Sequence, residues 1–131
     1  MKNKILIVFS VLLLSSCSFG AMHNKNLEQS IHSVMKDEGK LNLNKIAEFE
    51  WDEAHLFPPY TSQSEINKQL GFTFKDPSGM KSRDDIFLLL FLDNHKVVQY
   101  VEVSREYGEL IPKNHQPVTP SSSSFKVKRV N

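Results

Sequence analysis

The chain has 131 residues, 40% of them hydrophobic, and a formal net charge of +1. This length suits one domain with a single small core and argues against two. Residues 17–111 hold 10 of the 16 bases and all 15 acids, and such an acidic body makes nucleic acid an unsuitable partner, because phosphate binding needs a basic face.

The first residues have the pattern of a secretion signal. Two lysines precede an apolar run over residues 5–14 that only Ser10 interrupts, and Ser15 and Ser16 are the small residues that a signal peptidase needs. At 1.5 Å per residue this run covers about half of a hydrocarbon core ~30 Å thick. We therefore expect a signal peptide over residues 1–16 rather than a permanent transmembrane helix.

The only cysteine, Cys17, follows this segment directly. A single cysteine forms neither an intramolecular disulfide nor a zinc ligand set. Leu14-Ser15-Ser16-Cys17 resembles the lipobox of bacterial lipoproteins, in which the bond before the cysteine is cut and its thiol carries a diacylglyceryl group. The resemblance implies lipidation at Cys17, export, and attachment to a membrane of the cell envelope. An ordinary signal peptide with a chance cysteine is the alternative.

In bacterial lipoproteins the residue after the cysteine influences the membrane to which the protein is sorted. In Gram-negative lipoproteins an aspartate there commonly retains the protein at the inner membrane, and this chain has Ser18. The resemblance therefore implies the outer membrane if the host is Gram-negative.

After the cysteine, residues 17–25 show little periodic hydrophobicity and predict a lipidated, flexible tether. A helix is predicted next, with Asn26 as N-cap and Gly39 after its end. Its apolar residues recur at helical spacing, which favours a core-facing helix over a membrane-binding or partner-binding one. These residues are Leu27, Ile31, Val34 and Met35. His32 lies off this stripe and is expected to be solvated.

Residues 46–57 predict a half-buried strand. Ala47, Phe49 and Trp51 alternate with acidic residues, which indicates that Trp51 is first a core residue and second a binding platform. The alternation changes parity near residues 52–53, which predicts a β-bulge or a bend there. Two prolines at residues 58–59 end the strand.

A second helix is predicted after these prolines. Ser62 and Glu65 form a capping box, and Gly71 stands at the position after the helix. Residues 76–79 predict a type I turn within a long polar connection. Residues 86–92 are all apolar and predict a central strand, and residues 97–103 predict a strand that returns beside it as a hairpin.

The end of the chain is rich in proline and serine. Residues 112–124 predict an extended, poorly ordered link within a basic tail, residues 112–131. Phe125, Val127 and Val130 predict one last edge strand, with a disordered tail as the alternative. Residues 26–111 then form a small α+β domain: an antiparallel sheet of three to four strands with two helices packed on one face.

The search for chemistry is mostly negative. The sequence has no glycine-rich phosphate loop and no nucleophile elbow, so no catalytic residue is assigned and the chain is not expected to be an enzyme. His55 follows Asp52 and Glu53, but no ligand spacing typical of a metal site is present. We therefore expect no metal and no cofactor. The acidic run over residues 48–53 suits either a recognition surface for a basic partner or a solvated face.

Residues 49–61, FEWDEAHLFPPYT, resemble a pattern of small uncharacterised bacterial proteins and lipoproteins. In that pattern an aromatic-Trp-Asp strand leads through Phe and Pro-Tyr-Thr into a helix. The resemblance covers about a tenth of the chain and implies no activity or catalytic residue.

The corner at residues 57–61 is the favoured contact for a partner. Its two prolines restrict the backbone, which lowers the entropy lost on docking, and Tyr60 combines an apolar body with a polar tip. Glu50, Asp52 and Glu53 are expected nearby as steering charges. The alternative is that Tyr60 merely fastens the second helix to the sheet.

Together these features favour a non-enzymatic module that binds or assembles with an envelope protein. The alternative is an inhibitor or immunity-type lipoprotein that blocks a hydrolase or a toxin. An enzyme or a metal carrier is the third and least supported reading.

The first prediction concerns Cys17. We expect the mature chain to begin at this residue and to partition into detergent, since two or three acyl chains hold a small domain firmly on a membrane. Cys17→Ser should abolish fatty-acid labelling and release the protein from membranes. Metabolic labelling and membrane fractionation measure both effects, and equal labelling of the two forms would contradict the prediction.

Overall fold

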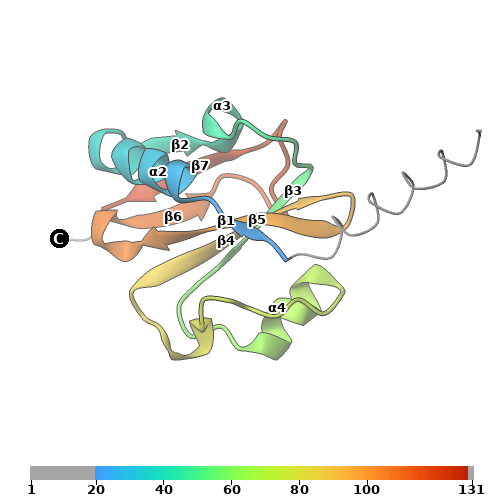
Figure 1. Ribbon diagram of the computed structural model, residues 1–131. Coiled ribbons are helices and arrows are strands. Elements are labelled where there is room, and N and C mark those ends of the chain that lie inside the picture. Colours follow the sequence, from blue (N-terminus) through green and yellow to red (C-terminus); the bar gives the residue numbers. More distant parts are fainter. Residues whose placement is uncertain (1–19, 130–131) are drawn as a thin grey trace, which may run out of the picture.

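The structure is a computed structural model that describes residues 20–129. It combines helices with two β-sheets, here called sheet A and sheet B (Figure 1). The helices are α2 (Lys25–Asp37), α3 (Leu43–Ile46) and α4 (Gln63–Leu70), with short 3₁₀ turns η3 (Met80–Ser82) and η4 (Arg105–Tyr107). Sheet A has the order β1 (Met22–His23), β5 (Lys96–Ser104), β4 (Ile86–Asp93) and β3 (Glu53–Phe57). Sheet B has the order β2 (Lys40–Asn42), β7 (Ser124–Lys128) and β6 (Glu109–Pro112).

The α+β class expected from the sequence is confirmed. All strand pairs are antiparallel except β1 with β5, which is parallel. The predicted hairpin is also present, because β4 and β5 pair from Ile86 with Ser104 to Asp93 with Lys96. The predicted signal peptide, Cys17 and the first part of the predicted tether lie outside the described residues.

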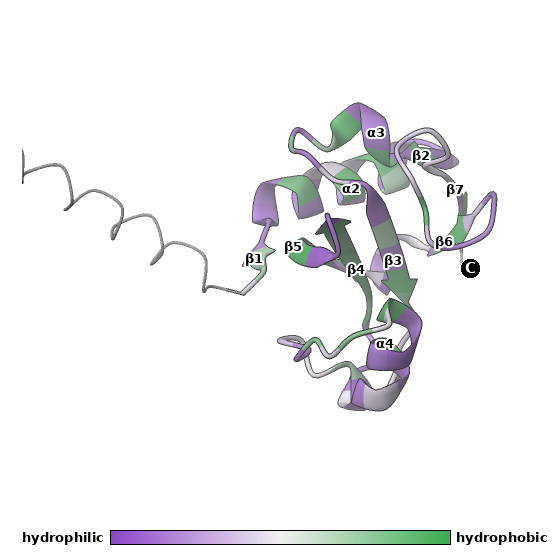
Figure 2. Cartoon of the chain, turned by 90° about the vertical axis from the view of Figure 1, so that its right-hand side faces the viewer, coloured by the Kyte–Doolittle hydropathy of each residue, from purple (hydrophilic) through white to green (hydrophobic). Residues whose placement is uncertain are grey.

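Strand β4 is buried on both faces, and Figure 2 shows how hydrophobic and hydrophilic residues are distributed over it and its neighbours. Phe87, Leu89 and Phe91 face the main core, which lies between α2, sheet A and sheet B. The alternate residues face a second core beneath α4 and η3. These are Ile86, Leu88, Leu90 and Leu92.

The two long helices consequently cover opposite faces of sheet A, with α2 above it and α4 below it in Figure 1. The expectation that both helices pack on one face is wrong. The physical reason lies in β4: a strand that is apolar on both faces needs cover on each of them.

Both helices begin and end with the local signals that the sequence contains. Helix α2 starts two residues earlier than expected, because the side chain of Asn24 accepts the N–H of Leu27 at 2.9 Å and Asn24, rather than Asn26, is the N-cap. Helix α4 has the predicted capping box between Ser62 and Glu65, and Gly71 ends it with a φ of 86°. Such a left-handed conformation suits glycine.

The strand predicted over residues 46–57 forms only in its second half, as β3. Residues 43–46 form the single turn α3, because the side chain of Asn42 accepts the N–H of Asn44 and caps it. Phe49 and Trp51 still face the core, and both rings meet Phe91 edge-on at centroid distances of 5.1 and 5.4 Å. The alternation therefore predicted burial correctly and conformation wrongly.

The C-terminal segment is part of the fold. Strand β7 lies between β2 and β6, so the expectation of an edge strand is wrong, and Phe125 and Val127 of β7 are buried. The preceding link is not loose either. Val118 is buried and exchanges two backbone hydrogen bonds with Ala54 of β3, at 2.8 and 2.9 Å. The expectation of a poorly ordered link is wrong for this stretch.

Both edges of sheet A are covered. Beside β3, the amide of Gln116 accepts the N–H of Leu56 at 2.6 Å. Beside β5, β1 pairs with Gln99 and Tyr100, so part of the predicted tether is a strand. Such cover removes the unpaired backbone groups that make open edges prone to aggregation.

Beyond β1, side chains of α2 continue the cover of β5. Glu28 Oε1 accepts the N–H of Glu102 at 2.8 Å, and His32 Nε2 accepts the N–H of Ser104 at 2.9 Å. His32 is half-buried and bonded, so the expectation that it is solvated is wrong.

The second prediction tests the main core. Trp51 is 7% exposed and shares this core with Leu89, with Phe49 packed against it. Trp51→Ala should lower the free energy of unfolding by about 3–5 kcal/mol, because it removes a buried ring and leaves a cavity. Chemical denaturation measures this, with exposed Ile111→Ala as a control that should change stability by at most about 0.5 kcal/mol. An unchanged midpoint for Trp51→Ala would show that the ring carries no packing energy.

Candidate functional site

The corner between β3 and α4 presents an exposed tyrosine in an unusual backbone conformation. Tyr60 is 62% exposed and has a φ of 65°. Its N–H donates to the carbonyl oxygen of Arg83 at 3.1 Å. A left-handed conformation costs a residue with a Cβ roughly 1–2 kcal/mol, and bulky residues rarely adopt it. Tyr60 therefore holds a strained position in which its ring gains little from burial.

Hydrogen bonds from its neighbours fix this corner. The hydroxyl of buried Thr61 donates to the carbonyl oxygen of Pro58 at 2.6 Å. The N–H of Ser62 donates to Glu65 Oε1 at 2.9 Å. This bond and a second one from the Ser62 hydroxyl lower the pKa of the Glu65 carboxyl. None of these contacts uses the Tyr60 ring.

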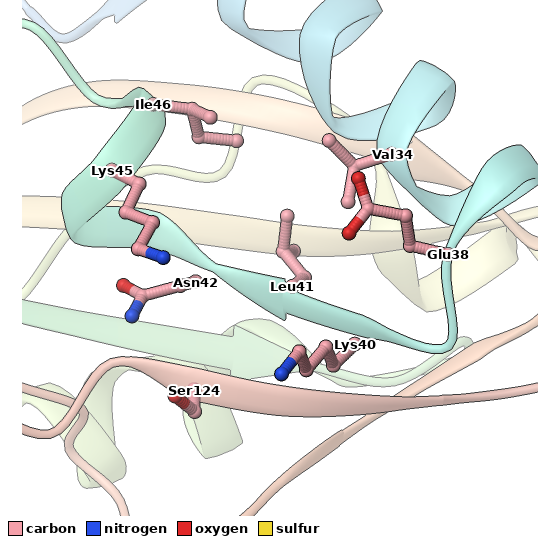
Figure 3. A pocket seen from close by; sticks show the side chains of 8 residues that line it. All are labelled: Val34, Glu38, Lys40, Leu41, Asn42, Lys45, Ile46 and Ser124. Atoms are coloured by element: carbon pink, nitrogen blue, oxygen red, sulfur yellow. The ribbon is translucent and has the colours of Figure 1, made fainter.

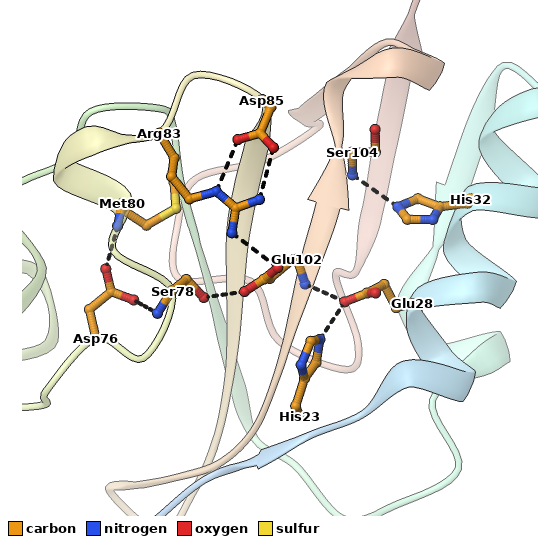
Figure 4. Close-up of polar contacts among 10 residues, drawn as sticks. All are labelled: His23, Glu28, His32, Asp76, Ser78, Met80, Arg83, Asp85, Glu102 and Ser104. Carbon is orange, nitrogen blue, oxygen red and sulfur yellow. Dashed lines mark hydrogen bonds and ion pairs between the residues drawn. The ribbon is translucent and has the colours of Figure 1, made fainter.

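The loop that receives the Tyr60 N–H is also tied down (Figure 4). Arg83 donates twice to the carboxylate of Asp85, at 3.0 and 2.8 Å, and once to Glu102 at 3.3 Å. The hydroxyl of Ser78 donates to the other oxygen of Glu102 at 2.8 Å. The bonds between Arg83 and Asp85 raise the pKa of the guanidinium and lower that of the carboxyl. The Tyr60 backbone thus rests on a pre-formed loop.

Tyr60 does not fasten α4 to the sheet, as the alternative interpretation of the sequence held. That contact is made by Ile66 of α4, which is fully buried with Phe57 and Met80 in the second core. Tyr60 itself is largely exposed and belongs to neither core.

The acidic residues lie at the opposite end of β3 from Tyr60. Asp52 is exposed, and its Oδ2 accepts the N–H of Asn94 at the β4–β5 turn. Glu53 pairs with Leu92 in the ladder, whereas Phe57 pairs with Leu88. At 3.3 Å per residue the two ends of β3 are about 13 Å apart. The expectation that Glu50, Asp52 and Glu53 lie near Tyr60 is therefore wrong, because β3 runs straight between them.

His55 is buried in β3 and 3% exposed. With the proton on Nε2, its ring donates to Glu53 at 3.1 Å and accepts from the amide of Gln69 at 3.1 Å. Both nitrogens are then used within the fold. Across residues 20–129 no group of three histidine, cysteine or carboxylate side chains is placed to hold a metal ion.

A second candidate site, here called the lysine groove, crosses α3, β2 and the start of β7 (Figure 3). Its first half is a cavity of about 210 Å³, and the second half shares Asn42, Lys45 and Ser124 with it. The first half is lined by Val34, Glu38, Lys40, Leu41, Asn42, Lys45, Ile46 and Ser124. The second is lined by Asn42, Asn44, Lys45, Lys113, Asn114 and residues 120–124.

No motif in the sequence predicted this groove. Its parts come from residues 34–46 and 113–124, which only the pairing of β2 with β7 brings together. The one available signal was the concentration of bases after residue 112, which was interpreted as a tail.

No protein-family model, no curated protein and no solved structure matches this chain. Within the part that the structure describes, no helix is long and apolar enough to cross a membrane.

His32 links the fold to pH. Its ring is tilted against Tyr107 at a centroid distance of 4.9 Å, and burial lowers its pKa from the usual 6.5 despite the opposing attraction of Glu28 and Glu106. The neutral ring is also the form that accepts the N–H of Ser104.

The third prediction follows from this lowered pKa. As the pH falls through about 6.5, the unfolded chain takes up a proton at His32 before the folded protein does, so stability should decrease until the folded pKa is passed. Melting temperatures between about pH 7.5 and about pH 5.5 measure the effect. His32→Gln, whose amide oxygen can accept the same N–H, should show a weaker dependence. Identical pH profiles for both proteins would refute the role of His32.

Proposed function

We propose that this chain is a lipid-anchored protein of the bacterial cell envelope that acts by binding another envelope protein, with Tyr60 as the central contact. The anchor rests on the lipobox resemblance of Leu14-Ser15-Ser16-Cys17. The binding role rests on the strained, exposed conformation of Tyr60.

This conformation supports a binding role because stability does not explain it. A glycine at this position would adopt the same φ without strain, and the Tyr60 ring contributes to neither core. Strained backbone positions cluster at functional sites, where the surrounding structure holds them. Here that support comes from the bonded loop at Arg83 and from the Thr61 and Ser62 contacts. Tyrosine is also among the residues that dominate interface energies.

The acidic end of β3 belongs to the same proposal at longer range. A standard interface covers about 800 Å² on each partner, which is wide enough to reach both ends of a five-residue strand. Glu50 and Asp52 are exposed and would act as steering charges, which raise the rate of association with a basic partner.

An inhibitor or immunity-type role is the second candidate, and the rigidity of the corner favours it. An inhibitor gains affinity when its contact residues are fixed before binding. The bonds that hold Tyr60 and its receiving loop lie within this chain, so they need no partner. In that case the partner is a hydrolase or a toxin, and its activity falls on binding.

The fourth prediction separates recognition from structure at Tyr60. Tyr60→Gly removes the ring and relieves the backbone strain, so its free energy of unfolding should equal that of the original protein or exceed it by up to about 1 kcal/mol. Partner retention should be lost. Chemical denaturation measures the first effect, and purification from detergent-solubilised membranes measures the second.

The matched control is Ile111→Ala, which shortens an exposed apolar side chain on β6. This variant should keep the partner. If the Tyr60→Gly variant retained the partner fully, or if this variant were clearly less stable, the result would show that Tyr60 has a structural role.

A further inference from the structure

The lysine groove carries an excess of positive charge, because Lys40, Lys45 and Lys113 line it and Glu38 is its single acid. In Figure 3 Lys45 and Asn42 lie at one end of the groove, Lys40 reaches toward β7, which carries Ser124, and Glu38 lies beside Val34. The ion pairs among residues 20–129 involve only histidine and arginine as the cationic partner. No lysine among residues 20–129 forms an ion pair, so the groove is set apart by three lysines and a single acid on one surface, an excess of positive charge that suits an anion from outside the chain.

The second half of the groove adds another cation and many neutral polar groups. Lys113 lies there with asparagine and serine side chains, and no acid lines this half. Amides and hydroxyls both donate and accept hydrogen bonds, which matches the hydroxyl groups of sugars. Aromatic side chains, on which nucleic-acid bases stack, are missing from both halves of the lining.

One amide in the groove is fixed in place with its donors free. Asn42 Oδ1 accepts the N–H of Asn44 at 3.0 Å and the hydroxyl of Ser123 at 2.7 Å. Ser123 is 3% exposed, and its carbonyl oxygen accepts the N–H of Leu43 at 3.0 Å. These bonds fix which end of the amide is the acceptor. Within the described residues Asn42 Nδ2 has no hydrogen-bond partner, so it is a pre-oriented donor toward the groove.

The shape of the groove favours an extended ligand. The two halves share Asn42, Lys45 and Ser124, so the surface continues from Val34 on α2 to Asn114 beyond β6. The second half is a polar, open surface, which suits a hydrophilic chain better than a compact apolar molecule that needs an apolar enclosure, whereas the first half also presents Val34, Leu41 and Ile46.

We infer that the lysine groove binds an acidic polysaccharide. Lys40, Lys45 and Lys113 contact its anionic groups, and Asn42 Nδ2 with the serine hydroxyls contacts its sugar hydroxyls. This site is built from α3, sheet B and the 113–124 segment, whereas Tyr60 lies between β3 and α4, so it is a binding activity in addition to the one proposed above.

The test measures binding of polygalacturonic acid to the full chain in detergent by titration calorimetry. The groove variant is Lys45→Gln/Lys113→Gln, and the control is Lys75→Gln/Lys81→Gln, which removes the same charge from exposed lysines near η3. Each lost charge-assisted contact should weaken binding by about tenfold, whereas the control should weaken it by less than about twofold. The single variant Lys113→Gln gives a second measurement if the double variant melts at a lower temperature.

Several outcomes would overturn the inference. Equal losses in the groove and control variants would mean that only net charge matters. Equal binding of neutral dextran would mean that the lysines do not select an anion. Tighter binding of single-stranded oligothymidylate through the same lysines would assign the groove to nucleic acid. If the protein did not bind polygalacturonic acid, the proposed polysaccharide site would be refuted.

Discussion

The burial of β4 on both faces is the constraint on which the rest of the structure depends. Seven successive apolar residues, 86–92, cannot be covered from one side, because neighbouring side chains of a strand point to opposite faces. One face is closed by α2 and sheet B, and the other by α4 and η3. The single domain therefore contains two cores. The long connection between α4 and β4 is needed to reach the second one, and Met80 from that connection fills it.

Once both faces of sheet A are covered, its two edges remain, and the protein covers each edge with different structural elements. Val118 and Gln116 bond β3, while β1, Glu28 and His32 bond β5. Where no strand is available, side chains take its place. They form hydrogen bonds with backbone groups that would otherwise bond to solvent or pair with another chain. The cover at β5 depends on a neutral histidine. The stability of this edge is thereby coupled to pH.

Local signals in the sequence predicted local structure well. The Ser62–Glu65 capping box, Gly71, the hairpin of residues 86–92 with 97–103 and the uninterrupted apolar run of β4 each depend on neighbours in sequence. Errors arose where distant contacts decide. Residues 47–52 alternate like a strand, yet they have no ladder partner and reach the core through Ala47, Phe49 and Trp51. Residues 113–128 read as a tail because their partners, Ala54 and β2, lie some sixty to ninety positions earlier. Tyr60 was predicted as a contact from composition, but its strain and the lysine groove depend on backbone geometry and pairing that composition does not contain.

Two exposed features remain that folding does not require. In most of this chain local and tertiary features are consistent, since helix caps, turns, strand patterns and edge cover all favour the same fold. Tyr60 departs from that agreement by adopting a conformation that glycine would adopt at lower energy. The groove departs from it by lining one surface with Lys40, Lys45 and Lys113, none of which forms an ion pair, beside the single acid Glu38. Each departure sits on a part of the fold that is firmly bonded beneath it, the Arg83 loop in one case and the Asn42–Ser123 contact in the other. A rigid support under an unfavourable exposed feature is the arrangement expected of a binding surface, because the support holds the feature ready and the ligand supplies the missing interaction.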